Sequence, residues 1–203
     1  MLYPLSYEGL AQADKKCTSP PAGARPLILD GVRGAGGLVA VAALLLAAAG
    51  CVRPTPPAPA EIRTTPPPWA APRDAVSHID LAGLPQLPLD TSEGLRRVRL
   101  RVLVDGRPVT VPPYVGVDRL RAVQAAAHTH DDTGTVYLEG TRGAAVTLGQ
   151  FFTLWGVRLD GRCLGATCGR VTVTGEGGEV GGDPRRVPLD GPASLTVAVA
   201  ATP

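Results

Sequence analysis

The fold of this chain is decided by residues 128–157, which begin His128-Thr-His-Asp-Asp-Thr-Gly-Thr-Val-Tyr-Leu-Glu139 and end Thr147-Leu-Gly-Gln-Phe-Phe-Thr-Leu-Trp-Gly-Val157. The stretch holds two of the three histidines, one of the two tryptophans and both phenylalanines of the 203-residue chain. Large aromatic side chains anchor a small core, and imidazoles are common metal ligands. The core anchors and the candidate ligands therefore fall together.

The second half of this stretch predicts a core helix. Thr147 is a favourable N-cap, and Gly156 is suited to end the helix. Phe151 and Trp155 lie four residues apart and so share one helical face, next to Phe152. Because only 4% of residues are aromatic, core packing explains these side chains better than an aromatic ligand site does.

Upstream, residues 97–104 alternate Arg-Val-Arg-Leu-Arg-Val-Leu-Val, which predicts a half-buried strand. Asp105-Gly106 is a turn, so residues 107–111 should return as the second strand of a β-hairpin. A short helix capped by Asp118 is predicted over residues 118–127. Further strands are predicted at residues 135–138, 171–174, 186–189 and 195–200. Together these elements predict an α+β domain with a small β-grasp-like sheet and one packed helix, the alternative being a small all-β sandwich.

Residues 32–50 predict an export signal, because an arginine precedes an apolar run at residues 38–49. The run is shorter than the roughly 20 residues that cross a bilayer, although a weak transmembrane helix is the alternative. Its end, Ala48-Ala-Gly-Cys51, resembles the lipobox of bacterial lipoproteins. That resemblance implies cleavage before Cys51, acylation of its thiol with fatty acids such as palmitate, and a location at the outer face of the cell membrane.

Residues 1–31 precede this signal and show no apolar pattern, which is unusual because export signals begin near the N-terminus. We expect that they are a mis-annotated extension and that translation starts at Val32. The alternative is a genuine cytoplasmic extension containing Cys17. Residues 51–74 are rich in proline, so they predict an extended tether that does not pack. A single globular domain is then expected over residues 75–203.

The candidate ligands are His128, His130, Asp131 and Glu139. On an extended segment the His-x-His spacing directs both imidazoles to one side, and Glu139 could close the site across the sheet. Two histidines and a carboxylate suit zinc, copper or iron. The alternative is a turn in which Asp131 or its neighbour caps backbone donors before Gly134.

Cys163 and Cys168 predict a local disulfide, because an exported protein meets an oxidising environment. Closing so short a loop should contribute roughly 2 kcal/mol to stability.

The segments His128-Thr-His-Asp, Thr147-Leu-Gly-Gln-Phe-Phe and Trp155-Gly-Val together resemble a domain of exported and membrane-anchored bacterial proteins with no established activity. The likeness covers residues 97–200 and implies one folded unit in the cell envelope. Members of that family are richer in histidine along the first strand, where this chain has Arg97 and Arg99.

These observations favour a non-enzymatic surface lipoprotein whose domain binds an envelope protein or a small ligand, with the membrane as partner through its lipid anchor. The alternative is a metal-binding protein or small metal-dependent oxidoreductase that uses His128, His130 and Asp131. The formal net charge of +2 argues against a nucleic-acid partner. No Ser-His-Asp or Cys-His catalytic signature is present.

Overall fold

In the computed structural model, which describes residues 59–140 and 146–202, the alternating arginine segment forms the long strand β2 (Arg96–Val104). Val98, Leu100 and Val102 are buried on one face of it. The turn at Asp105 and Gly106 has positive φ at both residues, 49° and 74°, as a tight two-residue hairpin turn requires. β3 (Arg107–Val109) then pairs antiparallel with β2, so the predicted hairpin is confirmed.

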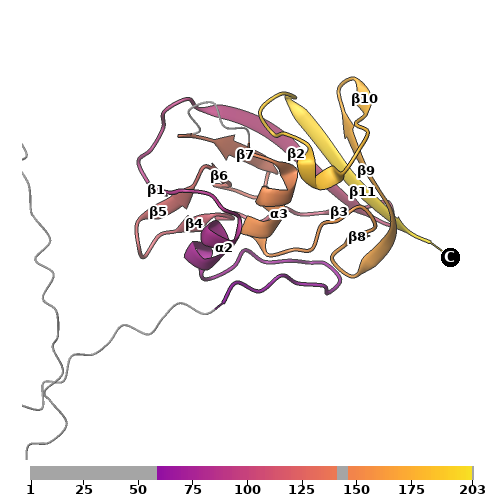
Figure 1. Cartoon of the computed structure of the whole chain (residues 1–203), viewed down its shortest axis with the longest axis horizontal. Helices are drawn as coiled ribbons and strands as arrows, with labels where there is room; N and C mark the ends of the chain where they lie inside the picture. The colour runs from indigo at the N-terminus through magenta and orange to yellow at the C-terminus, as the bar shows by residue number, and fades with distance from the viewer. Residues whose placement is uncertain (1–58, 141–145, 203) are drawn as a thin grey trace, which may run out of the picture. The chain divides into compact units, whose positions relative to one another are not determined.

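The main sheet has the strand order β10-β9-β11-β2-β7-β6, and β2 lies beside the last strand, β11, in parallel. A parallel pair needs a crossover connection, and here the crossover includes the helix α3 (Leu148–Trp155) (Figure 1). An early and a final strand side by side, with antiparallel neighbours and one helix across them, is the predicted α+β, β-grasp-like arrangement. The remaining strands are β6 (Ala127–His128), β7 (Thr135–Leu138), β8 (Cys163–Leu164), β9 (Thr167–Gly175), β10 (Gly178–Glu179) and β11 (Ser194–Ala201).

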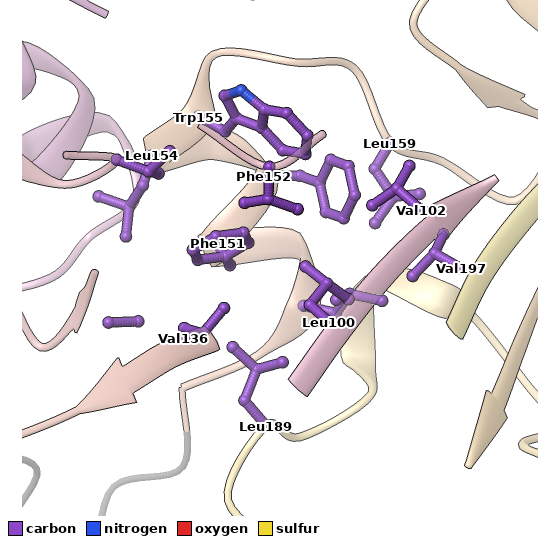
Figure 2. Close-up of a cluster of buried hydrophobic side chains, with 14 of the residues drawn as sticks. Leu100, Val102, Val136, Phe151, Phe152, Leu154, Trp155, Leu159, Leu189 and Val197 are labelled. Carbon is purple, nitrogen blue, oxygen red and sulfur yellow. The ribbon is translucent and has the colours of Figure 1, made fainter. Parts of the chain in front are cut away.

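The predicted core helix is α3 (Leu148–Trp155), and its ends follow the sequence closely. Thr147 forms a capping box with Gln150, and Gly156 closes the helix in the left-handed conformation with φ 67°. Phe151, Phe152 and Trp155 have no exposed surface. They belong to the same hydrophobic core as the apolar side chains of β2 and β11 (Figure 2).

The expectation that residues 51–74 do not pack is wrong for residues 59–74. Trp69 is 2% exposed and meets Trp155 edge-on, with 5.6 Å between ring centroids. Arg63 donates to the carbonyls of Trp155 and Gly156 at 2.6 and 3.1 Å, which satisfies acceptors that a helix C-terminus leaves free. The domain therefore begins before Ala75, because a tryptophan and an arginine within the proline-rich segment cap and cover α3.

The predicted helix over residues 118–127 is also wrong. Asp118 caps a turn, since its Oδ1 accepts from the backbone N–H groups of Leu120 and Arg121 at 3.0 and 2.9 Å. The chain then returns as a strand, which gives a small sheet in the order β1-β5-β4. Pairing with β1 outweighs the weak helical spacing of two apolar residues. The strands are β1 (Gln86–Pro88), β4 (Val117–Asp118) and β5 (Val123–Ala125).

Two further segments differ from the prediction. Residues 186–189 do not form a strand: the 3₁₀ helix η1 (Pro184–Arg186) ends there, and only an isolated bridge at Pro188 follows. Helix α2 (Ala75–Leu81), capped by Asp74, was not predicted and packs against α3. The predicted extension at residues 1–31, the predicted export signal at residues 32–50 and the predicted acylation site Cys51 lie outside the described residues. No helix in the described part of the chain is long and apolar enough to span a bilayer.

Candidate functional site

His128 is the buried centre of the candidate site. It lies on β6, has no exposed surface, and its Nδ1 is 3.0 Å from the carbonyl oxygen of Ala125. A carbonyl can only accept, so Nδ1 carries the hydrogen and the neutral ring presents a lone pair at Nε2. Burial lowers the pKa of His128, although the Ala125 hydrogen bond and the Glu139 charge act in the opposite direction. The ring is therefore neutral at pH 7.

His130 reaches this lone pair from the surface. Its side chain is exposed, and its Nε2 lies 3.2 Å from the Nε2 of His128. The two rings are perpendicular, and His130 also meets the edge of Tyr137 with 4.4 Å between centroids. The His-x-His spacing thus brings both imidazoles to one side, as predicted, and the pair extends from the interior to solvent.

Glu139 completes the cluster from the end of β7. Its Oε2 is 3.8 Å from the His128 Nε2 and accepts a 2.8 Å hydrogen bond from the amide of Gln124. Gln124 in turn donates to the carbonyl of Thr91 at 3.1 Å. The predicted proximity of Glu139 and His128 is confirmed, and the carboxylate is held by a buried amide.

Asp131 is held in a turn instead of facing the histidine pair. Its Oδ1 accepts from the backbone N–H and the hydroxyl of Thr133 at 2.9 and 2.6 Å, and the Thr133 hydroxyl is the main cause of its lowered pKa. This is the capping turn considered as the alternative. Gly134 closes it with φ 78°, and a Cβ there would lie 2.5 Å from the Leu100 carbonyl oxygen. Only glycine fits that approach to β2.

The histidine pair has the spacing of two ligands on one ion. Two nitrogens bonded to zinc at about 2.0–2.1 Å in tetrahedral geometry stand about 3.3 Å apart, close to the 3.2 Å observed. His128 also donates its other ring N–H to a carbonyl, as ligating histidines do. Within residues 59–140 and 146–202, however, no group of three His, Cys, Asp or Glu side chains is gathered closely enough to hold a metal. The arrangement is a two-imidazole pair with a nearby carboxylate.

Sequence reasoning missed Gln124 and Tyr137. Gln124 fell within the incorrectly predicted helix, so its hydrogen bond with Glu139 could not be predicted. Tyr137 lies in a correctly predicted strand, and its register opposite His128 is set only by the pairing of β6 with β7. Period-two alternation of Tyr137 and Glu139 was the available signal that both face the same side.

The other predicted residues lie elsewhere. The Cys163–Cys168 disulfide is present and joins β8 to β9, which confirms that prediction. His78, the third histidine, has its Nδ1 2.8 Å from the Thr153 carbonyl oxygen on α3. Cys51 lies outside the described residues.

Comparison of the chain with protein-family models, with curated proteins and with solved structures finds no match. The function is therefore inferred from the residues themselves.

Proposed function

We propose that this chain is an exported lipoprotein, anchored to the outer face of the cell membrane through Cys51, whose domain is a non-enzymatic module that binds a transition-metal ion at His128 and His130. The observation that carries the metal assignment is the 3.2 Å separation of the two Nε2 atoms. The anchor rests on the apolar run and lipobox of residues 38–51.

The protonation of the pair supports a chelate. Nδ1 of His128 carries its hydrogen, so the 3.2 Å contact requires the Nε2 of His130 to donate. A metal ion held by both nitrogens would replace that hydrogen. The hydrogen would then move to Nδ1 of His130, and because each imidazole must be neutral to bind the ion, affinity falls as the pH is lowered.

The surroundings favour an exchangeable metal ion over a structural ion whose coordination positions are all filled by protein side chains. His130 is exposed, so water or a ligand can occupy further positions on the ion. Glu139, 3.8 Å from the His128 nitrogen, supplies a negative charge beside the site. Imidazole nitrogens suit copper and zinc, and a carboxylate is accepted by both.

Packing of residues 59–74 shortens the tether. Eight residues of chain lead from Cys51 to Pro59, and they span at most about 29 Å when extended. An acylated Cys51 would therefore keep the domain near the bilayer.

The metal proposal is tested with residues 52–203, which include every described residue and exclude Cys17 and Cys51. Calorimetric titration with Cu²⁺ or Zn²⁺ should give one equivalent bound. His130→Ala should abolish it, and Glu139→Gln should weaken it by about 10–100-fold. Asp131→Asn is the matched control, because it removes a neighbouring exposed carboxylate that is engaged with Thr133. Equal affinity in the parent and His130→Ala would refute the proposal.

The anchor is tested in cells with the full chain and a clickable fatty acid. The parent should incorporate the label and sediment with membranes, and Cys51→Ser should lose the label. Cys17→Ser is the control and should behave as the parent. Label retained in Cys51→Ser would disprove acylation at that residue.

A further inference from the structure

The face of the main sheet turned away from α3 carries a row of three arginines. Arg97, Arg99 and Arg101 alternate along β2 with buried apolar residues and are all exposed. Side chains on one face of a strand repeat about every 6.6–6.8 Å. Three guanidinium groups therefore follow one another along a single line.

The positive charge of this row is not neutralised by ion pairs. Elsewhere in the domain the arginines 121, 158, 170 and 185 each pair with a carboxylate. Arg97 instead lies over the Tyr137 ring at 5.2 Å, and Arg99 donates to the Thr135 hydroxyl at 3.3 Å. Among the described residues, the ion pairs of the domain include none of the three. Two aspartates lie close to the row: the charge of Arg99 acts on the exposed Asp131, and Asp132 lines the same hollow as Arg101.

The neighbouring strands add short, uncharged side chains to the same face. Ser194 and Thr196 of β11 stand opposite Arg99 and Arg101, and Thr174 of β9 stands opposite Thr196. On the other side of the row, Tyr137 and Thr135 of β7 stand opposite Arg97 and Arg99. We call Arg97, Arg99 and Arg101, with Ser194, Thr196 and Thr174, the arginine face.

We propose that the arginine face lies against an anionic phospholipid surface and orients the domain on its membrane. The proposal rests on the proposed lipid anchor for its setting, since an anchor within about 29 Å of chain keeps such a surface within reach. Guanidinium groups that make no ion pair suit the phosphates of lipid headgroups. The acyl chain would hold the protein at the membrane, and the arginine face would decide which side is turned toward it.

The test uses residues 52–203, which carry no acyl group, so its result is independent of the anchor. Flotation with vesicles of phosphatidylcholine containing 30% phosphatidylglycerol should recover the protein, whereas pure phosphatidylcholine should not. The triple variant Arg97→Gln, Arg99→Gln, Arg101→Gln should bind about 100-fold more weakly. A matched control removes three exposed arginines outside the sheet, Arg73→Gln, Arg162→Gln and Arg186→Gln, and should bind within about threefold of the parent.

Two further experiments distinguish binding to a charged lipid surface from binding of a single phosphate group in a specific site. Replacing the three arginines by lysine should retain most vesicle binding, because a charged membrane responds to net charge, whereas a bidentate phosphate site would lose its ligand. Inorganic phosphate at equal ionic strength should not compete. The proposal is overturned if the glutamine triple variant binds as tightly as the parent, if the control loses as much, or if phosphate competes. If the parent floats but the acyl label is absent in cells, only the anchor fails.

Discussion

His128 and Trp155 lie near opposite ends of the same 30-residue stretch, and both are fully buried. Trp155 is surrounded by aromatic and aliphatic groups and needs one hydrogen bond, from its Nε1 to the Trp69 carbonyl at 3.1 Å. His128 has a polar contact at each ring nitrogen, from Ala125 and His130. Two equally buried side chains are thus stabilised in different ways. Trp155 depends on the volume that it fills in the core, and His128 depends on its hydrogen-bond partners.

The largest effect should come from removing volume at the apolar end. Trp155→Ala should lower the free energy of unfolding by about 3–5 kcal/mol, because it leaves a cavity between α3 and the sheet and removes the contact with Trp69. Guanidinium denaturation measures this loss. Trp155→Phe should cost less, and a loss below about 1 kcal/mol for the alanine variant would contradict the core role of this residue.

Leucine at His128 and leucine at Phe151 compare the cost of losing polar partners with the cost of an apolar substitution. His128→Leu should cost about 2–3 kcal/mol, because it leaves the carbonyl oxygen of Ala125 without the buried ring N–H that it accepts from. Phe151→Leu, a swap between apolar residues, should cost less than about 1.5 kcal/mol. Urea unfolding of the two variants gives the comparison directly. The reverse order would show that His128 acts only as a space-filling side chain.

The polar end should also respond to pH. Burial lowers the pKa of His128 below its ordinary value of 6.5, so below that pH the unfolded chain binds the proton more readily than the folded chain. Stability is therefore full above about pH 6.5 and falls as the pH drops toward the lowered pKa, with a slope of at most about 1.4 kcal/mol per pH unit. Denaturation between pH 5 and 7.5 measures the slope. His128→Leu should reduce it, and Trp155→Phe should leave it unchanged.

The smallest stability effect is expected at the exposed member of the pair. His130→Ala should change the free energy of unfolding by less than about 0.5 kcal/mol, because the side chain is exposed. The proposed metal binding should nevertheless be lost. Thermal unfolding with and without Zn²⁺ shows both: the parent should be stabilised by the ion and the variant should not. Equal stabilisation of the two would place the metal elsewhere.

The sequence alone predicted the elements whose signals are local. The hairpin followed from alternation and an Asp-Gly turn, α3 from Thr147 and Gly156, and the disulfide from the Cys163 and Cys168 spacing. It also predicted that two histidines would face one side, because side-chain direction along a short extended segment depends only on neighbouring residues.

Tertiary structure decided what depends on distant partners. It brought Gln124 to Glu139 and turned Asp131 toward Thr133. It also packed Trp69 against Trp155. The local sequence pattern does not predict these contacts. A proline-rich segment or a weakly helical one takes whichever conformation buries its apolar groups and pairs its polar groups. The energy of that choice lies in contacts between residues far apart in the chain.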